Sequence, residues 1–308
     1  MRTRRIGSLE VSVVGVGCNN FGRRVDEAGT RRVVDAALEA GINFFDTADI
    51  YGDEGASERF LGRALRGRRG EALIATKFGK PMDEARRGAR PEYVRRAAED
   101  SLQRLGTDYI DLYQLHEPDP EVPIAETLGA LNELVREGKV REIGCSNFSV
   151  EQLREAEAAA QPGSARFVSV QNEYSLFHRE PEEGMLAECA RQNIAFIPYF
   201  PLASGLLTGK YRKGAPVPEG SRLSGGRYGT LLSDENLERV EQLISFAEAR
   251  GRTLLELAFA WLLDRPQVAS VIAGATRTEQ VRANAAAAVE WHFSDADRAE
   301  IDRILGPG

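Results

Sequence analysis

Four polar residues stand where short apolar runs of the sequence end, and together they could act on a carbonyl group. Asp46, Lys77 and His116 each close such a run, and Tyr51 follows Asp46 by five residues. If the runs are parallel strands, their carboxyl ends meet at one edge and bring the four side chains together. The set then contains a carboxylate, a phenol, an ammonium and an imidazole, which are the groups of an acid–base site.

The chemistry predicted for this set is proton donation by Tyr51 to a carbonyl oxygen that becomes an alkoxide when a hydride arrives. A tyrosine with an ordinary pKa of about 10 is a poor acid at neutral pH, so we expect Lys77 to lower the pKa of Tyr51. Asp46 is expected to keep Lys77 charged against desolvation. His116 is expected to be neutral and to hydrogen-bond the carbonyl. Each residue alone is more often structural, so the prediction rests on their joint occurrence.

The elements that must position these residues alternate between strands and helices. Eight short β-branched or apolar runs predict strands at 13–17, 42–46, 72–77, 109–116, 140–145, 167–172, 194–199 and 268–273. Between them the apolar residues recur with a helical period. Pro91 and Pro123 mark first turns, and Gly41, Gly106 and Gly138 follow last turns.

Three further helix starts are predicted from a hydroxyl residue followed three positions later by an acceptor. These pairs are Ser149 with Gln152, Thr253 with Glu256, and Ser294 with Asp297.

Eight strands alternating with helices can form an open doubly wound sheet or a closed barrel. The strand starts are roughly 25 to 35 residues apart through most of the chain, and no linker or composition break separates two domains. We therefore expect one (β/α)8 TIM barrel domain over residues 1–308. A hairpin of 3–7 with 10–14, turning at Ser8 and Leu9, is expected to cap the barrel, with extra helices after the seventh strand and at the C-terminus.

The interval before the eighth strand is the longest, and long loops in compact domains are usually functional. It contains a loop at 203–230 and helices near 234–250 and 253–265. The loop is basic in an acidic protein, so an anionic ligand is expected there. Its basic residues are Lys210, Arg212, Lys213, Arg222 and Arg227, against Glu219.

Composition narrows the partners and the location. The net charge of -7 argues against nucleic-acid or anionic-membrane partners. No signal-peptide core or long apolar run occurs, so a cytoplasmic protein is expected. Cys18, Cys145 and Cys189 form no Cys-x-x-Cys pair and are expected to be free thiols, and no metal site is expected.

The chain resembles the aldo-keto reductase superfamily, and in particular its bacterial and potassium-channel-β-like branch. The motifs that carry this resemblance span the chain in order: 43–52 (NFFDTADIYG) with Ser57 and Glu58, the Lys77 strand, 111–116 (DLYQLH), 138–148 (GKVREIGCSNF), 171–174 (QNEY), 199–202 (YFPL) and 205–210 (GLLTGK). The resemblance implies a catalytic tetrad at Asp46, Tyr51, Lys77 and His116, the same four residues found from their positions.

The resemblance also implies an NADP(H) site at the mouth of the barrel. Ser146, Asn147 and Gln171 are expected to bind the nicotinamide carboxamide, and Tyr199 to stack on the ring. The other implied contacts are Gly17, Cys18 and Asn19 along the cofactor, Pro201, Leu202, Ser204, Leu206 and Lys210 at the pyrophosphate, and Gly274, Ala275, Thr276, Arg277, Gln280 and Asn284 at the adenosine end.

NADPH is preferred over NADH because Arg277 precedes a predicted helix start near Thr278, where free N–H groups and the helix dipole favour a phosphate. Two residues depart from the family pattern. Ala273 replaces a usual proline, and Ala283 replaces a glutamate that contacts adenine in many relatives. A looser adenine site is therefore expected.

The predicted function is an NADP(H)-dependent aldo-keto reductase of the alcohol dehydrogenase type that reduces an aldehyde or ketone. Phe21, Phe78, Glu117, Phe148 and Tyr228 are the candidates for the substrate pocket wall, which would suit small aromatic or apolar aldehydes. The substrate itself, the direction of the reaction in the cell and the oligomeric state stay open.

Other functions are weighed against this one. A redox-sensing or regulatory subunit that binds NADP(H) with little turnover is the alternative. A Schiff-base aldolase would need an uncharged Lys77, which Asp46 opposes. A metal-dependent hydrolase is disfavoured because His116, His178 and His292 are isolated. A Rossmann fingerprint is incomplete, since Asn20 stands where its third glycine should be.

Overall fold

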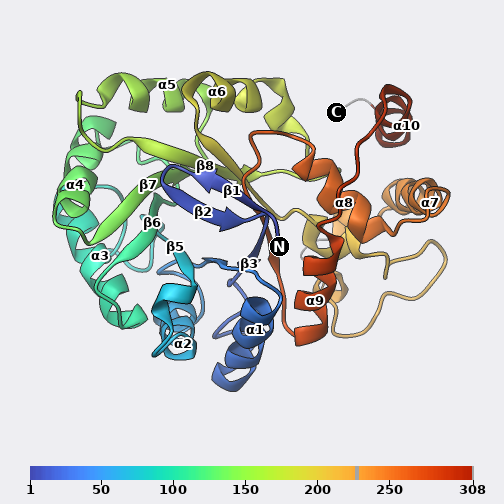
Figure 1. Ribbon diagram of the computed structural model, residues 1–308, viewed down its shortest axis with the longest axis horizontal. Coiled ribbons are helices and arrows are strands. Elements are labelled where there is room, and N and C mark those ends of the chain that lie inside the picture. Colours follow the sequence, from blue (N-terminus) through green and yellow to red (C-terminus); the bar gives the residue numbers. More distant parts are fainter. Residues whose placement is uncertain (226–228, 307–308) are drawn as a thin grey trace.

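A barrel of eight parallel strands forms the centre of the computed structural model, which describes residues 1–225 and 229–306 (Figure 1). From β3 to β9 each strand pairs with the next along the chain, and β10 pairs with β3. The strands are β3 (Val14–Gly17), β4 (Phe44–Asp46), β5 (Leu73–Phe78), β6 (Ile110–Leu115), β7 (Val140–Ser146), β8 (Phe167–Glu173), β9 (Ala195–Tyr199) and β10 (Val271–Gly274).

The circle closes between β9 and the segment that leads into β10. The Phe196 N–H donates to the Gln267 carbonyl at 2.7 Å, and the Ala269 N–H donates to the Phe196 carbonyl at 3.0 Å. The closed barrel predicted from the sequence is therefore confirmed. The eighth strand begins later than predicted, because Val268 forms only an isolated bridge with Phe196 before β10 starts at Val271.

The N-terminal hairpin lies across one end of the barrel (Figure 1). It consists of β1 (Thr3–Ile6) and β2 (Leu9–Ser12), which run antiparallel with Ile6 opposite Leu9. The turn is therefore Gly7–Ser8, one residue earlier than predicted. Gly7 adopts a φ of 56°, and the early turn lets Leu9 bury its side chain.

Helices surround the barrel (Figure 1). As predicted, two of them, α7 and α8, lie between β9 and β10, and another, α10, is near the C-terminus. The α-helices are α1 (Glu27–Glu39), α2 (Ala56–Ala64), α3 (Pro91–Leu105), α4 (Ile124–Arg136), α5 (Val150–Ala159), α6 (Met185–Gln192), α7 (Asp234–Glu248), α8 (Leu254–Leu263), α9 (Thr278–Ala287) and α10 (Asp295–Leu305).

The predicted helix starts are confirmed where the signal is local. Ser149, Thr253 and Ser294 each cap a helix, and each is part of a complete capping box with its partner three residues on. Pro91 is the first residue of α3. Pro123 lies one position earlier than predicted, because it caps α4 instead of occupying its first turn.

The core has two parts, one inside the barrel and one outside it. Alternate strand residues such as Phe44, Ala75 and Leu112 fill the interior, where they pack with Ile6 and Leu9 of the hairpin. A larger cluster joins the outer face of the strands to the helices. Because side chains alternate along a strand, the inward positions two residues after Phe44, Ala75 and Leu112 are Asp46, Lys77 and Gln114. A polar layer therefore lies directly on the apolar interior.

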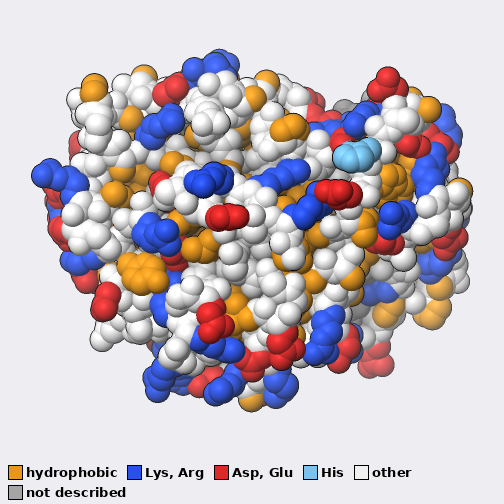
Figure 2. All heavy atoms as spheres, in the orientation of Figure 1, with side chains coloured by type: hydrophobic (Ala, Val, Ile, Leu, Met, Phe, Trp, Pro, Cys, Tyr) orange, Lys and Arg blue, Asp and Glu red, His pale blue; other side chains and the backbone are white. Residues whose placement is uncertain are grey.

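The surface carries mixed charges and few exposed apolar side chains. On the face that carries the hairpin, acidic and basic groups are interspersed (Figure 2). Among the residues in the two described ranges, the exposed large apolar side chains are Met1 and Val217. Cys18, Cys145 and Cys189 are buried and free, as predicted. No helix in the described part of the chain has both the length and the apolarity needed to cross a membrane.

Candidate active site

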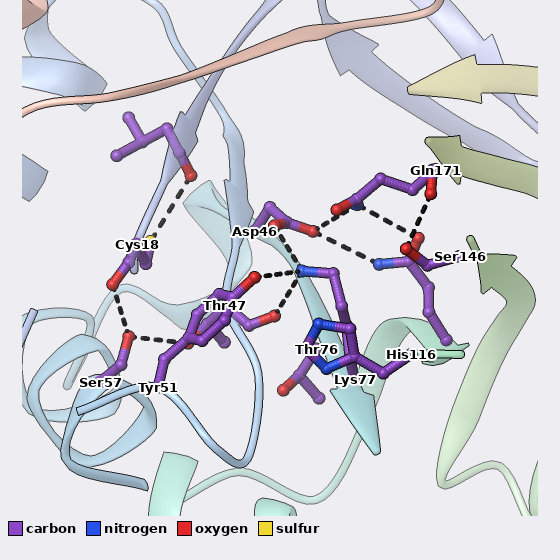
Figure 3. A network of polar contacts seen from close by, with 12 residues as sticks. Cys18, Asp46, Thr47, Tyr51, Ser57, Thr76, Lys77, His116, Ser146 and Gln171 are labelled. Carbon is purple, nitrogen blue, oxygen red and sulfur yellow. Dashed lines mark hydrogen bonds and ion pairs between the residues drawn. The ribbon is translucent and has the colours of Figure 1, made fainter. Parts of the chain in front are cut away.

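Three neighbouring strands bring the four predicted catalytic residues together (Figure 3). Asp46 ends β4, Lys77 lies near the end of β5, and His116 directly follows β6. Tyr51 lies in the loop after β4. Two backbone bonds align these segments, since the Asp49 N–H donates to the Lys77 carbonyl at 3.0 Å and the His116 N–H to the Phe78 carbonyl at 2.8 Å.

Lys77 is the centre of the polar contacts. Its ammonium donates to Asp46 Oδ2 at 2.6 Å, to the Thr47 carbonyl at 2.9 Å and to the Tyr51 hydroxyl at 3.5 Å. Burial alone would lower the pKa of Lys77, but the Asp46 carboxylate and the Tyr51 hydroxyl outweigh burial and hold it above its ordinary value. Lys77 is therefore charged at neutral pH, as the sequence predicted. A charged lysine argues against the Schiff-base reading.

The predicted direction of the Tyr51 pKa shift is wrong. Burial raises the pKa of Tyr51 above its ordinary value. Lys77 opposes this increase with a smaller effect, and the Asp46 carboxylate adds to the increase. Tyr51 is thus a neutral phenol that retains its proton. Lys77 still favours the phenolate once the proton leaves, so it reduces the cost of proton donation without making the free phenol acidic.

His116 has the neutral character that was predicted. Burial, Lys77 and Lys80 hold the pKa of His116 well below its usual range. Its ring lies edge-on to Tyr51 with centroids 5.9 Å apart. Its Nδ1 is buried and has no hydrogen-bond partner within the described residues. A neutral imidazole next to the phenol can hydrogen-bond a substrate oxygen without competing with Lys77 for charge.

The predicted carboxamide-binding residues form one network at the ends of β7, β8 and β9. The Ser146 hydroxyl donates to the Gln171 carbonyl at 2.7 Å, and the Asn147 amide donates to the His116 carbonyl at 2.9 Å. Tyr199 donates to Asn147 Oδ1 at 2.8 Å. Asn147 adopts a φ of 61°, a conformation that Asn tolerates better than most residues. The network fixes these side chains beside the catalytic residues.

One residue of the site was not predicted from the sequence. Gln114 is fully buried on β6, and its amide donates to Asp46 Oδ1 at 3.3 Å. The signal was present in the sequence, because a strand period of two places Gln114 on the same inward face as His116.

The other predicted cofactor contacts lie around the same end of the barrel. Gly17 and Gly274 are register partners on β3 and β10, and a Cβ on Gly17 would meet its nearest neighbour at 3.5 Å. Most of them have little exposed surface: Cys18, Pro201, Leu206 and Ala275 are buried, and Leu202 and Asn19 are half-buried. Lys210 is exposed, and the backbone of Ser204 adopts a φ of 57°.

The end of the site near β10 suits a phosphate. Arg277 is the N-cap residue of α9, is exposed, and makes no side-chain capping bond. Gln280 accepts hydrogen bonds from the Thr276 backbone at 2.7 Å and the Thr276 hydroxyl at 3.1 Å, and Asn284 is buried one turn further on. The helix starts at Thr278, as predicted, so its first N–H groups and Arg277 face the same region.

The substrate wall predicted from aromatic residues is not supported. Phe21 and Phe78 are completely buried in the core, where Phe78 stacks on Tyr113, and Phe148 packs against Phe167. Glu117 is half-buried and pairs with Lys80 at 3.7 Å. Tyr228 lies outside the described residues. Among the described residues of the predicted wall, Glu117 is therefore the one that stays partly open to solvent.

The basic loop is less available to an anion than its composition predicted. Arg212 makes two bonds to Glu241, at 2.7 and 2.8 Å, and Lys213 pairs with Glu238, both on α7. Arg222 donates to Asn20 at 3.3 Å and lies over the Phe200 ring. Arg227 is outside the described residues. The ion pairs with α7 tie down the loop, so an anion would have to compete with glutamates for Arg212 and Lys213.

Comparison with known proteins agrees with this geometry. The profile of the Aldo/keto reductase family matches residues 13–305. The "Aldo-keto reductase yakc [NADP(+)]" of Schizosaccharomyces pombe is 38% identical, over 97% of this chain and 90% of that protein. A probable voltage-gated potassium channel subunit beta of Arabidopsis thaliana is 35% identical, over 92% of this chain and 90% of that protein.

A solved structure extends the likeness to three dimensions. A glycerol dehydrogenase from Gluconobacter oxydans superposes with a TM-score of 0.85 at 32% identity, over 98% of this chain and 94% of that one. These matches cover nearly the whole barrel, including every strand that carries a catalytic candidate. The chain therefore belongs to the aldo/keto reductase family and is an oxidoreductase.

Proposed function

We propose that this protein reduces an aldehyde or ketone to an alcohol with NADPH, and that Tyr51 donates the proton. The observation that carries the proposal is the bonded series Asp46–Lys77–Tyr51 next to a neutral His116. No separate acid is needed, because the raised pKa of Tyr51 keeps its proton in place until a substrate oxygen needs it.

The residues would act in the following way. His116 and the Tyr51 hydroxyl hold the substrate carbonyl oxygen by hydrogen bonds. The nicotinamide, when bound, supplies the hydride. As negative charge develops on the substrate oxygen, Tyr51 transfers its proton to that oxygen and becomes a phenolate, which the adjacent Lys77 ammonium stabilises. Asp46 keeps Lys77 in place through the bond from the ammonium to Oδ2. The product alcohol leaves, and Tyr51 takes a proton from solvent.

The residues expected to hold the cofactor fit a nicotinamide dinucleotide phosphate. Asn147, Ser146 and Gln171 present amide and hydroxyl groups beside the tetrad, and Arg277 at the α9 terminus offers a cation where a phosphate is favoured. The relative from S. pombe carries NADP(+) in its name. Arg277 and the name of that relative support NADPH over NADH, since the carboxamide is common to both cofactors.

The test is a fluorescence titration with NADPH and NADH, followed by turnover of a carbonyl panel by wild-type protein and by Tyr51→Phe. We expect Tyr51→Phe to bind NADPH with nearly unchanged affinity and to lose about 10²- to 10⁴-fold in kcat, since only proton transfer is removed. Tyr113→Phe is the matched control, because the Tyr113 hydroxyl is buried without a partner among the described residues. Equal kcat values for the two variants would remove Tyr51 from this role.

A second candidate is an NADP(H)-binding redox sensor or regulatory subunit. The similarity to a probable potassium channel subunit beta favours it. Such a protein would bind NADPH tightly but would oxidise it very slowly with every carbonyl in the panel. Tight binding together with turnover below about 0.01 per second, far under typical enzyme rates, would favour the sensor.

A further inference from the structure

Gln114 occupies a buried position inside the barrel that the structure keeps open for a long polar side chain. It is the register partner of Lys77 on β5 and of Gly144 on β7. A Cβ on Gly144 would lie 2.4 Å from Ser169 Oγ and 3.3 Å from Gln114 Cγ. A side chain at Gly144 would therefore crowd both Ser169 and Gln114.

The two oxygens of Asp46 have separate partners. Oδ2 accepts from the Lys77 ammonium at 2.6 Å, and Oδ1 accepts from the Gln171 amide at 2.8 Å and the Gln114 amide at 3.3 Å. Because a carboxylate only accepts hydrogen bonds, both glutamines must turn their NH₂ groups toward it. Gln171 also donates to Gln114 Oε1 at 3.4 Å. The three side chains therefore fix one another's orientation.

We propose that Gln114 is a positioning residue for the reduction: with Gln171 it holds Asp46 Oδ1, so that Oδ2 stays on the Lys77 ammonium. This inference rests on the proposed function. A carboxylate with one anchor can rotate away from its cation, whereas two buried donors on the other oxygen prevent that rotation. Gln114 thereby acts through Asp46 and Lys77 on the phenolate that Tyr51 must form.

A first variant, Gln114→Met, keeps the length of the side chain and removes both of its hydrogen-bonding groups. We expect kcat to fall about 5- to 10-fold at every pH, a loss within the range that one intramolecular hydrogen bond typically accounts for. The KM for the carbonyl and the affinity for NADPH should change less than about 3-fold, because Gln114 is fully buried and would act through Asp46. Wild-type kcat across the pH range would overturn the proposal.

A second variant, Gln114→Glu, gives the proposal a pH signature. Next to Asp46 the introduced carboxyl should titrate above its ordinary range, because two adjacent carboxylates repel each other. When protonated, it donates to Asp46 Oδ1 as the glutamine does, so kcat at pH 6 should be within about 3-fold of wild type. When ionised, it repels Asp46, and kcat should fall reversibly by more than about 10-fold by pH 9. A profile that follows the wild type would contradict the role.

Gln192→Glu is the matched control. Gln192 is also buried and donates to a carboxylate, Glu188 Oε1, at 2.8 Å, but it lies on α6 outside the barrel interior. The same substitution there should leave the pH profile of kcat unchanged. If Gln114→Glu does not fold, as judged by circular dichroism, Gln114→Met decides the question by itself.

Melting temperature provides a readout that needs no turnover. Gln114→Glu should lose melting temperature relative to Gln114→Met as pH rises from 6 to 9, since the like charges meet only in the folded protein. If wild-type protein reduces no carbonyl, the proposed function fails while this measurement still tests the contact with Asp46. A constant difference between the two variants would show that the introduced carboxyl does not face Asp46, and would overturn the inference.

Discussion

Asp49 is a buried carboxyl group in the loop that carries Tyr51. Only 1% of it is exposed, and neither carboxyl oxygen has a hydrogen-bond partner among the described residues. Burial, with a smaller contribution from Glu58, raises the pKa of Asp49 from 3.8 to about 7, although Arg104 opposes the increase. In the folded protein Asp49 therefore binds a proton that the unfolded chain releases near pH 4.

This difference predicts a pH-dependent cost. Between about pH 4 and pH 7 the folded state holds the proton more tightly, so the free energy of unfolding falls as pH rises and stays low above pH 7. Asp49→Asn removes the titrating group. We expect the variant to be more stable than the wild type by about 2–4 kcal/mol at pH 8, with a smaller gain at pH 5.

Urea unfolding at pH 5 and pH 8 measures this effect. Asp53→Asn is the control, because Asp53 lies in the same loop but is exposed. A gain for Asp49→Asn that does not grow with pH would mean that Asp49 is ionised in the folded protein at both pH values.

That Asp46, Tyr51, Lys77 and His116 lie together could be predicted from the sequence, whereas their protonation behaviour could be predicted only in part. Strand ends and the period of two are local features, so Asp46, Lys77 and His116 were placed correctly. The Tyr51 pKa was predicted in the wrong direction because its main cause, burial, depends on everything packed around the phenol. The phenylalanines were misplaced for the same reason: a side chain's exposure depends on neighbours distant in sequence.

At the scale of elements, α2 and α3 approach closely at Gly62. A Cβ on Gly62 would lie 2.0 Å from the Leu105 carbonyl oxygen, which belongs to the backbone at the end of α3. We expect Gly62→Ala to cost about 2–4 kcal/mol, because a backbone contact cannot give way as a side chain can. Gly129→Ala in α4 is the matched control, since nothing lies within 4 Å there, and it should gain about 0.5–1 kcal/mol.

Chemical denaturation of both glycine variants tests this packing. A mild effect of Gly62→Ala, comparable with that of Gly129→Ala, would mean that the two helices can separate without loss. The close approach also bears on the site, because α2 follows the Tyr51 loop and its Glu58 binds Arg104 of α3 at 2.6 Å.

The start of α9 makes a prediction about cofactor choice. If Arg277 binds the 2′-phosphate that distinguishes NADPH from NADH, Arg277→Met should weaken NADPH binding about 10- to 100-fold and NADH binding less than about 3-fold. Arg282→Met, on the same helix but paired with Glu39 at 3.5 Å, is the control. A fluorescence titration in which Arg277→Met weakens both cofactors equally would contradict a role in phosphate recognition.

Among the elements, local signals predicted more than long-range ones. The capping boxes at Ser149, Thr253 and Ser294 were correct because each involves residues three positions apart. The composition of the basic loop could not show that two of its charges, on Arg212 and Lys213, are met by Glu241 and Glu238, which belong to a different element. No local pattern reveals that α7 folds back along the loop.

At the scale of the whole molecule, the barrel has its weakest ladder where its two ends meet. β9 reaches the segment before β10 through one isolated bridge and its flanking backbone bonds, whereas the other adjacent pairs have longer registers. Arg4 of the hairpin reinforces this seam. Its guanidinium donates to the Arg265 carbonyl at 3.0 Å, the Leu263 carbonyl at 2.6 Å and the Val268 carbonyl. Residues near the N-terminus thus hold a seam made late in the chain.

Removing this contact should therefore weaken the whole fold without changing the chemistry. Arg4→Met keeps an apolar stem but leaves three part-buried carbonyls without their donor, which we expect to cost about 2–4 kcal/mol in the free energy of unfolding. Arg5→Met is the matched control, since Arg5 is its exposed neighbour on the same strand. Because the hairpin caps the end of the barrel opposite the tetrad, kcat should be unchanged in both variants. Equal unfolding curves for Arg4→Met and Arg5→Met would show that the backbone bonds alone hold the seam. A fall in kcat for Arg4→Met would mean that closure of the barrel also sets the geometry of Lys77 and Tyr51.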